Sequence, residues 1–389
     1  MVMNSFPTEI LYFAVNRWDS MVQREQHLML GLSRTYRILF IDPPLSYATI
    51  LLGKSQGKRW AFKSRLHRVN ERLLVYTPPA FPPCSQYFRC INSLNIRLLI
   101  SLAKGVLDKL YFKDYMVGVG RPFLADVIKR LNPRLSYYDC SDDYAEFPGL
   151  RADKGMLREA EEELLRTVDL VFCSSEELTK AKSLYNKNSF FLPNGVDLDS
   201  LQDRDSVMET PPEMKDVKKP IIGYIGTIGE WFDFDTLIAL AQKRHDWAFV
   251  LIGPLASGRY SSLLQKASNI YWLGEKSFVE LLSYLKFFDV CTIPFKVNEF
   301  TMKIYPTKFH QYLAAGKPVV SSPLPDLLAF KPWVDFYTDA REMEEKIDRA
   351  IREDSEEKAL ERRRIASENT WDERVKSMIE ILNTYLGKK

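Results

Sequence analysis

The sequence has few of the residues that bind metals or form disulfide bonds. It contains 5 cysteines and 4 histidines in 389 residues. The cysteines are scattered and odd in number, and none forms a C-x-x-C pair, which argues against a zinc knuckle and against a disulfide framework. We therefore expect a reducing compartment. These cysteines are Cys84, Cys90, Cys140, Cys173 and Cys291.

Long hydrophobic runs are also lacking. No run approaches the roughly 20 apolar residues that a membrane-spanning helix needs. The longest apolar-leaning segment, residues 94–115, is interrupted by six charged residues. Residues 1–10 are neither basic nor a long apolar stretch, so we expect no signal peptide. These features predict a cytoplasmic protein.

Length and charge further narrow the class of protein. A chain of 389 residues is too long for one core and fits two domains. With 46% hydrophobic and 27% charged residues, it is globular. The net charge is only +3, but residues 1–130 contain 19 Lys and Arg against 8 Asp and Glu. A basic first part and an acidic remainder suggest that the first part faces an anionic partner.

Short apolar stretches alternate with helical spacers in two successive series. This alternation predicts parallel sheets with right-handed crossovers. A polar, proline-bearing stretch at residues 198–220 separates the two series and reads as a linker. Two doubly wound α/β domains predict a ligand cleft at the carboxyl ends of both sheets. The expected strands are residues 10–15, 37–42, 73–77, 115–120, 135–140 and 170–174, then 221–225, 248–253, 270–273 and 290–294.

The most informative segment is residues 305–320, with the sequence YPTKFHQYLAAGKPVV. Pro306 suits the first turn of a helix, and Gly316 suits the C′ position that ends one. A helix that opens after a loop points its unpaired N–H groups toward an anion. A diphosphate fits this position, with Lys308 in the first turn to neutralise it. Without further motifs, an ordinary helix–strand unit explains the segment equally well.

Three other segments follow predicted strands. The first, residues 223–235 (GYIGTIGEWFDFD), has glycines that let the backbone approach a phosphate closely. A second, residues 138–149 (YDCSDDYAEFPG), clusters carboxylates that suit acceptor hydroxyls or base catalysis, or a helix cap. The third, residues 16–28 (NRWDSMVQREQHL), brings basic residues and a histidine to the start of a helix.

Together the four segments resemble GT-B glycosyltransferases, specifically the family 4-like group 1 enzymes of bacterial cell-surface polysaccharide and teichuronic acid synthesis. The resemblance runs from about Val15 to Leu327. It implies two Rossmann-like domains facing a central cleft, with a final helix that crosses back to the first domain. The expected boundaries are an acceptor domain at residues 1–197, a linker at 198–220, a nucleotide-sugar domain at 221–365 and the crossing helix at 366–389.

The resemblance also implies roles for individual residues. Each role is carried over to a residue of this sequence that lies in a matching motif. Donor binding falls to residues of the second domain, while acceptor binding and catalysis fall mainly to the first. The expected donor-binding residues are Gly226, Thr227, Gly229, Gly253, Lys308 and Gln311. The expected catalytic residues are Asp139, Asp142, Asp143, His27 and Glu299. The residues expected to bind acceptor or phosphate are Arg17, Trp18 and Arg24.

This chain departs from the family pattern near the donor. Many members carry Arg and Lys after the glycine loop, where this chain has Glu230, Trp231 and Asp233. Gln311 replaces the Glu whose carboxylate accepts hydrogen bonds from the ribose, so the charge-assisted strength is lost. The upstream partner Glu is Lys303 here, and Glu299 is the nearest acid. Glu299 reads either as its substitute or as a solvated loop residue.

No metal is expected, because the D-x-D patterns at residues 197–199 and 233–235 read better as a turn and a helix cap. The basic first domain mixes apolar and charged side chains, which suits an anionic membrane face. Nucleic acid would fit the charge alone, but no nucleic-acid motif accompanies it, so none is expected. The residues of this basic stretch are Lys54, Lys58, Arg59, Trp60, Phe62, Lys63, Arg65 and Arg68, then Tyr87, Phe88 and Arg89.

The sequence therefore predicts a glycosyltransferase that moves a sugar from a UDP- or GDP-sugar to a glycan or lipid-linked acceptor. The resemblance implies retention of anomeric configuration, no metal and no other cofactor, and peripheral contact with the inner face of the cell membrane. Two alternatives stay open. One is a nucleotide-sugar-binding subunit without transfer activity, and the other is a GT-B sugar epimerase.

Overall fold

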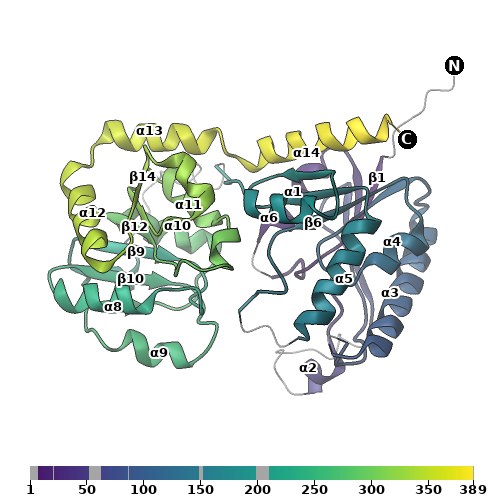
Figure 1. The fold of residues 1–389 in the computed structure, drawn as a ribbon, viewed down its shortest axis with the longest axis horizontal. Coiled ribbons are helices and arrows are strands. Elements are labelled where there is room, and N and C mark those ends of the chain that lie inside the picture. Colours follow the sequence, from purple (N-terminus) through teal and green to yellow (C-terminus); the bar gives the residue numbers. More distant parts are fainter. Residues whose placement is uncertain are drawn as a thin grey trace. The chain divides into compact units, whose positions relative to one another are not determined.

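The computed structural model describes residues 8–20, 22–51, 63–85, 87–148, 152–198 and 210–388. The chain divides into two compact units (Figure 1). The N-terminal unit contains Met1–Pro193 and Arg374–Lys389, and the C-terminal unit contains Asn194–Glu373. Part of the expected linker, residues 199–209, lies outside the described residues.

The N-terminal unit is built on an eight-stranded sheet in the order β3-β4-β2-β1-β5-β6-β7-β8. Two of its strands, β6 and β7, are buried along their whole length, as in sheets that helices cover on both faces. The strands are β1 (Glu9–Phe13), β2 (Arg37–Ile41), β3 (Arg65–Arg68), β4 (Leu73–Thr77), β5 (Tyr115–Val119), β6 (Leu135–Cys140), β7 (Leu170–Cys173) and β8 (Ser189–Phe191). The helices are α1 (Arg24–Leu32), α2 (Tyr47–Leu51), α3 (Arg89–Leu110), α4 (Ala125–Leu131), α5 (Lys154–Thr167) and α6 (Glu176–Ser183).

One strand of this sheet departs from the expected parallel pattern. β3 pairs antiparallel with β4, and the sequence analysis did not anticipate it. Only four residues separate the two strands, a connection too short for the crossover that parallel pairing requires. β3 is an edge strand with the polar sequence RLHR, three of whose residues are exposed, so it lacks the apolar signal of the other strands.

The C-terminal unit has a six-stranded parallel sheet in the order β11-β10-β9-β12-β13-β14. Helices cover both of its faces (Figure 1). The strands are β9 (Ile221–Ile225), β10 (Ala248–Ile252), β11 (Ile270–Trp272), β12 (Val290–Ile293), β13 (Val319–Ser321) and β14 (Val334–Phe336). The helices are α8 (Phe234–Lys243), α9 (Arg259–Leu264), α10 (Phe278–Phe287), α11 (Thr307–Ala314), α12 (Ala340–Glu353) and α13 (Glu356–Ser367), with 3-10 helices at Pro212–Met214, Thr301–Lys303 and Pro325–Phe330.

The last helix, α14 (Trp371–Leu386), runs from the end of the second unit into the first. Its residues from Arg374 onward belong to the N-terminal unit. There Val375 packs against Gly31 of α1 so closely that a Cβ added at Gly31 would lie 2.4 Å from the valine side chain. The Tyr36 hydroxyl also bonds the Asn383 side chain at 3.2 Å. The chain end thus completes the packing of the first unit.

Within the described residues, α3 is long and apolar enough to cross a membrane by length and composition. Its apolar side is used in the core, where Ile96, Leu99, Ile100 and Leu107 are almost fully buried. Core helices of soluble proteins pass the same compositional test, so this is weak evidence for a spanning segment. The opposite side of α3 exposes Leu94 and other residues discussed below.

Candidate functional site

Both sheets have a point where the strand order reverses. In the C-terminal sheet it lies between β9 and β12, because β10 and β11 extend to one side and β13 and β14 to the other. Ligands of open α/β sheets bind at such points, outside the carboxyl ends of the strands. Gly226 follows β9 and Phe295 follows β12 at this edge. These two positions mark where a donor nucleotide is expected.

The segment expected to bind the diphosphate forms the predicted helix, turn and strand. α11 begins at Thr307 with Pro306 as its N-cap, one residue before the expected first turn. Gly316 has φ +73°, and the amides of Gly316 and Lys317 donate to the carbonyls of Leu313 and Tyr312. That is the Schellman pattern, which needs a left-handed residue at C′. β13 then starts at Val319, as predicted.

Buried polar contacts fix where α11 begins. The amide of Ile225, the last residue of β9, donates to the Tyr312 hydroxyl at 2.8 Å. Before the helix, the Tyr305 hydroxyl shares a 2.6 Å hydrogen bond with Nε2 of the fully buried His310. The Asn194 side chain donates to the Tyr305 carbonyl. The start of α11 is therefore held rigidly beside the end of β9.

Lys308 in the first turn of α11 points toward the glycine loop. Its Nζ lies 5.1 Å from the ring centroid of Tyr224 and 4.9 Å from that of Phe295. Both distances suit a cation–π contact. Burial lowers the pKa of Lys308 to about 8. In the described part of the chain, no carboxylate or other hydrogen-bond acceptor is recorded for this ammonium group.

The glycine loop leaves space for that lysine. A Cβ at Gly226, whose φ is +138°, would lie 2.7 Å from Cε and 3.0 Å from Nζ of Lys308. A Cβ at Gly253, with φ +142°, would lie 2.2 Å from the Gly226 carbonyl oxygen. Gly229 is buried against the Trp231 ring, and Thr227 is exposed at the turn. Only glycine fits at the first two positions, so the ends of β9 and β10 are shaped around Lys308.

The remaining expected donor residues lie around this group. Gln311 is partly buried on α11, one turn after Lys308. Glu299 is largely exposed, and its carboxylate lies 3.4 Å from Lys303. Glu230 pairs with Arg259 at 2.6 Å. Arg259, from the first turn of α9, thus brings a basic side chain to the loop that lacks the family's usual Arg and Lys.

The N-terminal sheet reverses its order between β1 and β5. The loop after β1 is organised by Glu25 of α1, a residue that the sequence analysis did not select. Its two carboxylate oxygens accept hydrogen bonds from the amides of Val15 at 2.9 Å and Asn16 at 2.6 Å. Burial raises the pKa of Glu25 to about 7, although these two hydrogen bonds favour the charged form. The helix expected within residues 16–28 begins at Arg24, after this loop.

Arg24 and Asp139 form a buried ion pair beneath this loop. The Arg24 guanidinium contacts Asp139 Oδ1 at 2.9 Å, and the two residues are 7% and 3% exposed. Arg24 also donates to the Leu192 carbonyl at 2.7 Å, and the Tyr12 hydroxyl lies 3.5 Å from the second oxygen of Asp139. The geometry gives both residues a structural partner in addition to any role in binding.

The carboxylate cluster after β6 is partly buried at the same edge. Burial raises the pKa of Asp142 to about 6, against the lowering effect of its bond with Ser141 and of the Arg24 charge. Asp143 is partly buried beside it. The Tyr144 hydroxyl donates to the Gly120 carbonyl at 3.0 Å and lies 3.1 Å from the Ser141 hydroxyl. These bonds tie the cluster to the loop after β5.

The other expected acceptor residues come from the loop after β1. The Trp18 amide donates to Asp42 at 2.8 Å, and its ring packs edge-on against Phe40. The Arg17 carbonyl accepts from the Gln26 side chain at 3.3 Å. His27 is partly buried on α1. These expected residues therefore lie in one segment of one unit.

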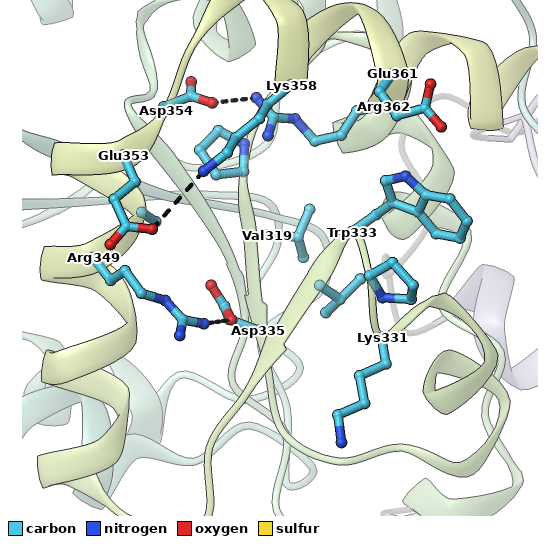
Figure 2. Close-up of a pocket in the computed structure, with 14 residues that line it drawn as sticks. Val319, Lys331, Trp333, Asp335, Arg349, Glu353, Asp354, Lys358, Glu361 and Arg362 are labelled. Atoms are coloured by element: carbon cyan, nitrogen blue, oxygen red, sulfur yellow. Dashed lines mark hydrogen bonds and ion pairs between the residues drawn. The ribbon is translucent and has the colours of Figure 1, made fainter.

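A cavity of about 280 Å³ lies elsewhere in the C-terminal unit (Figure 2). It is lined by the first residues of β13 and β14, so it opens at the edge opposite the glycine loop. Figure 2 shows Arg349 beside Asp335, Lys358 directed at Glu353, and Arg362 at Asp354. Three of its four basic side chains thus have an acidic partner, and Arg362 also holds the Gly316 carbonyl. This hollow is a charge-balanced structural region that supports the end of α11.

Among the described residues, no group of three or more His, Cys, Asp or Glu side chains is arranged to hold a metal ion. The five cysteines are free, with Cys140, Cys173 and Cys291 buried.

Part of this chain is similar in sequence to known glycosyltransferases. Residues 235–380 match the family described as "Glycosyl transferase-like". Over 218 residues the chain is 27% identical to the putative teichuronic acid biosynthesis glycosyltransferase TuaH of Bacillus subtilis (strain 168). That match covers 52% of this chain and 54% of the relative, so the chain spans about half the length of the curated relative it matches.

Solved structures match nearly the whole chain. An E. coli protein described as "Trehalose-6-phosphate" and bound with UDP-2-fluoro glucose aligns with a TM-score of 0.69 at 12% identity, covering 96% of this chain and 98% of the other. Anabaena HepE in complex with UDP and glucose aligns with a TM-score of 0.67 at 15% identity, covering 97% and 100%. Such identities show the fold alone. The expected resemblance is confirmed: the chain has the GT-B fold with two Rossmann-like units, and residues 235–380 match the glycosyl transferase-like family model.

Proposed function

We propose that this protein transfers a sugar from a nucleotide-diphosphate sugar to a glycan or lipid-linked acceptor in cell-surface polysaccharide synthesis. The observation that carries the proposal is Lys308. A desolvated ammonium group with no recorded anionic partner in the described residues lies at the strand-order reversal of the C-terminal sheet. Burying a cation without a counter-charge is unfavourable, so such a position favours an anionic ligand.

The donor diphosphate fits this position. Lys308 faces the loop at Gly226, and the amides of Thr307 and Lys308 at the start of α11 have no partner inside the helix. An anion at this point gains from the ammonium charge, the helix dipole and these N–H groups together. Gln311, one turn further, then lies where the ribose of the nucleotide is expected. UDP is the favoured donor nucleotide, because two proteins of the same fold have been solved with UDP or a UDP-sugar.

Catalysis would depend on stabilising the leaving diphosphate. Negative charge develops on the diphosphate as the bond to the sugar breaks, and preorganised charges aimed at it are typically the largest catalytic contribution. Lys308, held between two aromatic rings, is such a preorganised charge. We propose a metal-independent reaction with retention, in which the acceptor attacks from the face that the diphosphate leaves.

The N-terminal unit would bind the acceptor. Asp142 and Asp143 are partly buried at the carboxyl edge of the sheet, and Asp142 has a raised pKa, as suits a group that exchanges protons. His27, Arg17 and Trp18 line the neighbouring loop and remain candidates for sugar contact. Asp139 and Arg24 are assigned a positioning role, because each is the buried partner of the other.

The exposed side of α3 suits a membrane that carries a lipid-linked acceptor. Phe88 is 55% exposed and Leu94 is 48% exposed, and they alternate with the exposed basic residues Arg89 and Arg97. Mixed apolar and basic residues favour the surface of anionic membranes. The part of the expected basic stretch at residues 54–62 lies outside the described residues. We propose peripheral contact at the cytoplasmic face, which sedimentation with phosphatidylglycerol vesicles tests directly.

The test of the enzymatic proposal is a donor screen without added metal. Thermal shift and hydrolysis would be measured with UDP-, GDP-, ADP- and dTDP-sugars. We expect one nucleotide to raise the Tm and its sugar to be released slowly. Stabilisation without release, even with lipid-linked acceptors, would favour the non-catalytic subunit. Release of an epimerised nucleotide sugar would favour the epimerase, an alternative whose fold a Listeria protein described as a putative UDP-N-acetylglucosamine 2-epimerase shares at a TM-score of 0.57.

A further inference from the structure

Arg121 occupies the strand-order reversal of the N-terminal sheet. It follows β5 by two residues, directly after Gly120. The Gly120 amide donates to the Phe13 carbonyl at the end of β1, at 2.9 Å. A Cβ at Gly120 would lie 2.9 Å from the Val15 side chain. The backbone before Arg121 is therefore fixed against β1, at the edge where open sheets bind ligands.

The Arg121 side chain is partly buried there, and one of its donors is left unpaired. Its Nε is buried and has no hydrogen-bond acceptor, and no ion pair is recorded for it in the part of the chain that the structure describes. Arginine carries five N–H donors and cannot lose its charge in a protein. Leaving the buried Nε–H unpaired costs free energy, so this position favours a ligand that accepts from it.

The nearby acidic and hydroxyl groups are already engaged. Glu25 and Tyr144 are the groups whose charges act on Arg121, where burial lowers the arginine pKa. Both oxygens of Glu25 accept backbone amides, and the Tyr144 hydroxyl donates to the Gly120 carbonyl. Asp139 is held by Arg24. Arg24 is thus paired with a carboxylate, whereas Arg121 has no hydrogen bond or ion pair among the described residues.

We propose that Arg121 binds an anionic group, a carboxylate or a phosphate, on the acceptor sugar. A planar guanidinium recognises both groups through two parallel hydrogen bonds, which gives orientation as well as affinity. The inference rests on the proposed function, because it assigns the N-terminal unit to the acceptor. Arg121 would then select acidic over neutral acceptors.

Binding is measured first, with D-glucuronate, glucose 6-phosphate and glucose as probes, by NMR titration of the full-length protein. We expect the two anionic sugars to bind and glucose to bind more weakly. Arg121→Gln should weaken the better anionic probe about 10- to 100-fold, the range for a charged hydrogen bond. Arg121→Lys keeps the charge but loses the pair of parallel hydrogen bonds. Its affinity for the anionic probe should therefore lie between those of the wild-type and Arg121→Gln proteins. The two anionic probes decide between carboxylate and phosphate.

Arg130→Gln is the matched control, because Arg130 is exposed at the end of α4. It should leave all three affinities unchanged. Equal affinities in the Arg121→Gln and Arg130→Gln proteins would overturn the proposal, and so would equal binding of glucose and the anionic sugars. Loss of UDP affinity in Arg121→Gln, with the sugars unaffected, would assign Arg121 to the donor and also overturn it. Donor binding and UDP-sugar hydrolysis by the wild-type protein test the proposed function separately.

Discussion

The strand-order reversals of the two sheets carry different electrostatics. In the C-terminal sheet, a single ammonium group, that of Lys308, lies between two aromatic rings beside a glycine loop. In the N-terminal sheet, Arg24, Asp139 and Glu25 are bonded to one another or to the backbone, whereas the buried Nε of Arg121 has no hydrogen-bond partner among the described residues. The first region is built around a single cation without a counter-charge, and the second around paired charges with Arg121 beside them.

This difference separates residues that bind from residues that hold the structure. Breaking a buried ion pair should cost folding stability, because it leaves a buried charge uncompensated. Removing a buried cation that has no partner should instead lower the affinity for the ligand and raise the folding stability. The same class of substitution is therefore expected to have opposite effects on stability in the two regions.

The largest expected effect is on stability, from Asp139→Asn. Arg24 would remain buried without its counter-charge, which typically destabilises a protein by about 3–5 kcal/mol. Denaturant unfolding measures this change. The exposed pair of Lys129 and Glu163 offers a control, since Glu163→Gln should cost less than about 1 kcal/mol. If Asp139→Asn lost transfer activity but kept its stability, Asp139 would instead have a catalytic role.

Next in size is the loss of donor affinity in Lys308→Ala. Removing the charge that meets the diphosphate should weaken UDP binding by about 1.5–3 kcal/mol. Uridine, which lacks the diphosphate, should bind equally well to both proteins in calorimetric titrations. Lys266, exposed after α9, provides the control Lys266→Ala. A UDP affinity that survives the change at Lys308 would remove this residue from the site.

Substitution of Lys308 should weaken donor binding but stabilise the folded protein. Because burial lowers the pKa of Lys308 from 10.5 to about 8, the charged form is less favourable in the folded state than in the unfolded state. Below pH 8 the protein bears this cost, and it disappears as the pH rises from 8 toward 10.5. Lys308→Met should therefore raise the unfolding free energy at pH 7 by about 1–3 kcal/mol. A lower unfolding free energy would show that the ammonium is stabilised internally.

UDP affinity should also depend on pH. The free protein loses the Lys308 proton as the pH rises through about 8, so binding that needs the ammonium is complete below that pH and weakens above it. Between pH 7 and 9 we expect a loss of roughly tenfold, which corresponds to about 1.4 kcal/mol. Uridine affinity should stay level over the same range. A flat profile for UDP would separate the diphosphate from this lysine.

The smallest expected effect concerns Gln311→Glu. A carboxylate would accept ribose hydrogen bonds more strongly than an amide carbonyl, with a gain of about 0.5–1.5 kcal/mol. The variant should gain affinity for UDP but not for 2′,3′-dideoxy-UDP, which lacks the hydroxyls. An equal gain for both nucleotides, or none, would place Gln311 away from the ribose.

The sequence predicted the regular elements well where local signals were strong. The alternation of apolar stretches indicated most strands of both sheets, and Pro306 and Gly316 marked the ends of α11 closely because turn chemistry is local. β3, β8 and β14 were missed. β3 is a short polar edge strand, and β8 and β14 have only three residues each, so none of them carries a periodic apolar signal.

Residues whose role depends on tertiary contacts were not predictable in this way. Glu25 was not selected, because its bonds to Val15 and Asn16 require the loop after β1 to fold back. Arg121 lies outside the four motifs, and its isolation is visible only once its neighbours are placed. Arg259 approaches Glu230 from a different helix. Contacts between such distant segments leave no signal in the spacing of residues along the chain.

The most direct test of the donor site is the pKa of Lys308, measured by NMR on lysine-labelled protein with and without UDP. Lys308→Met identifies its signal. The account predicts a pKa of about 8 in the free protein and a clear rise when UDP binds, since the diphosphate supplies the missing counter-charge. A pKa near 10.5 in the free protein, or one that UDP leaves unchanged, would contradict the placement of the donor diphosphate at Lys308.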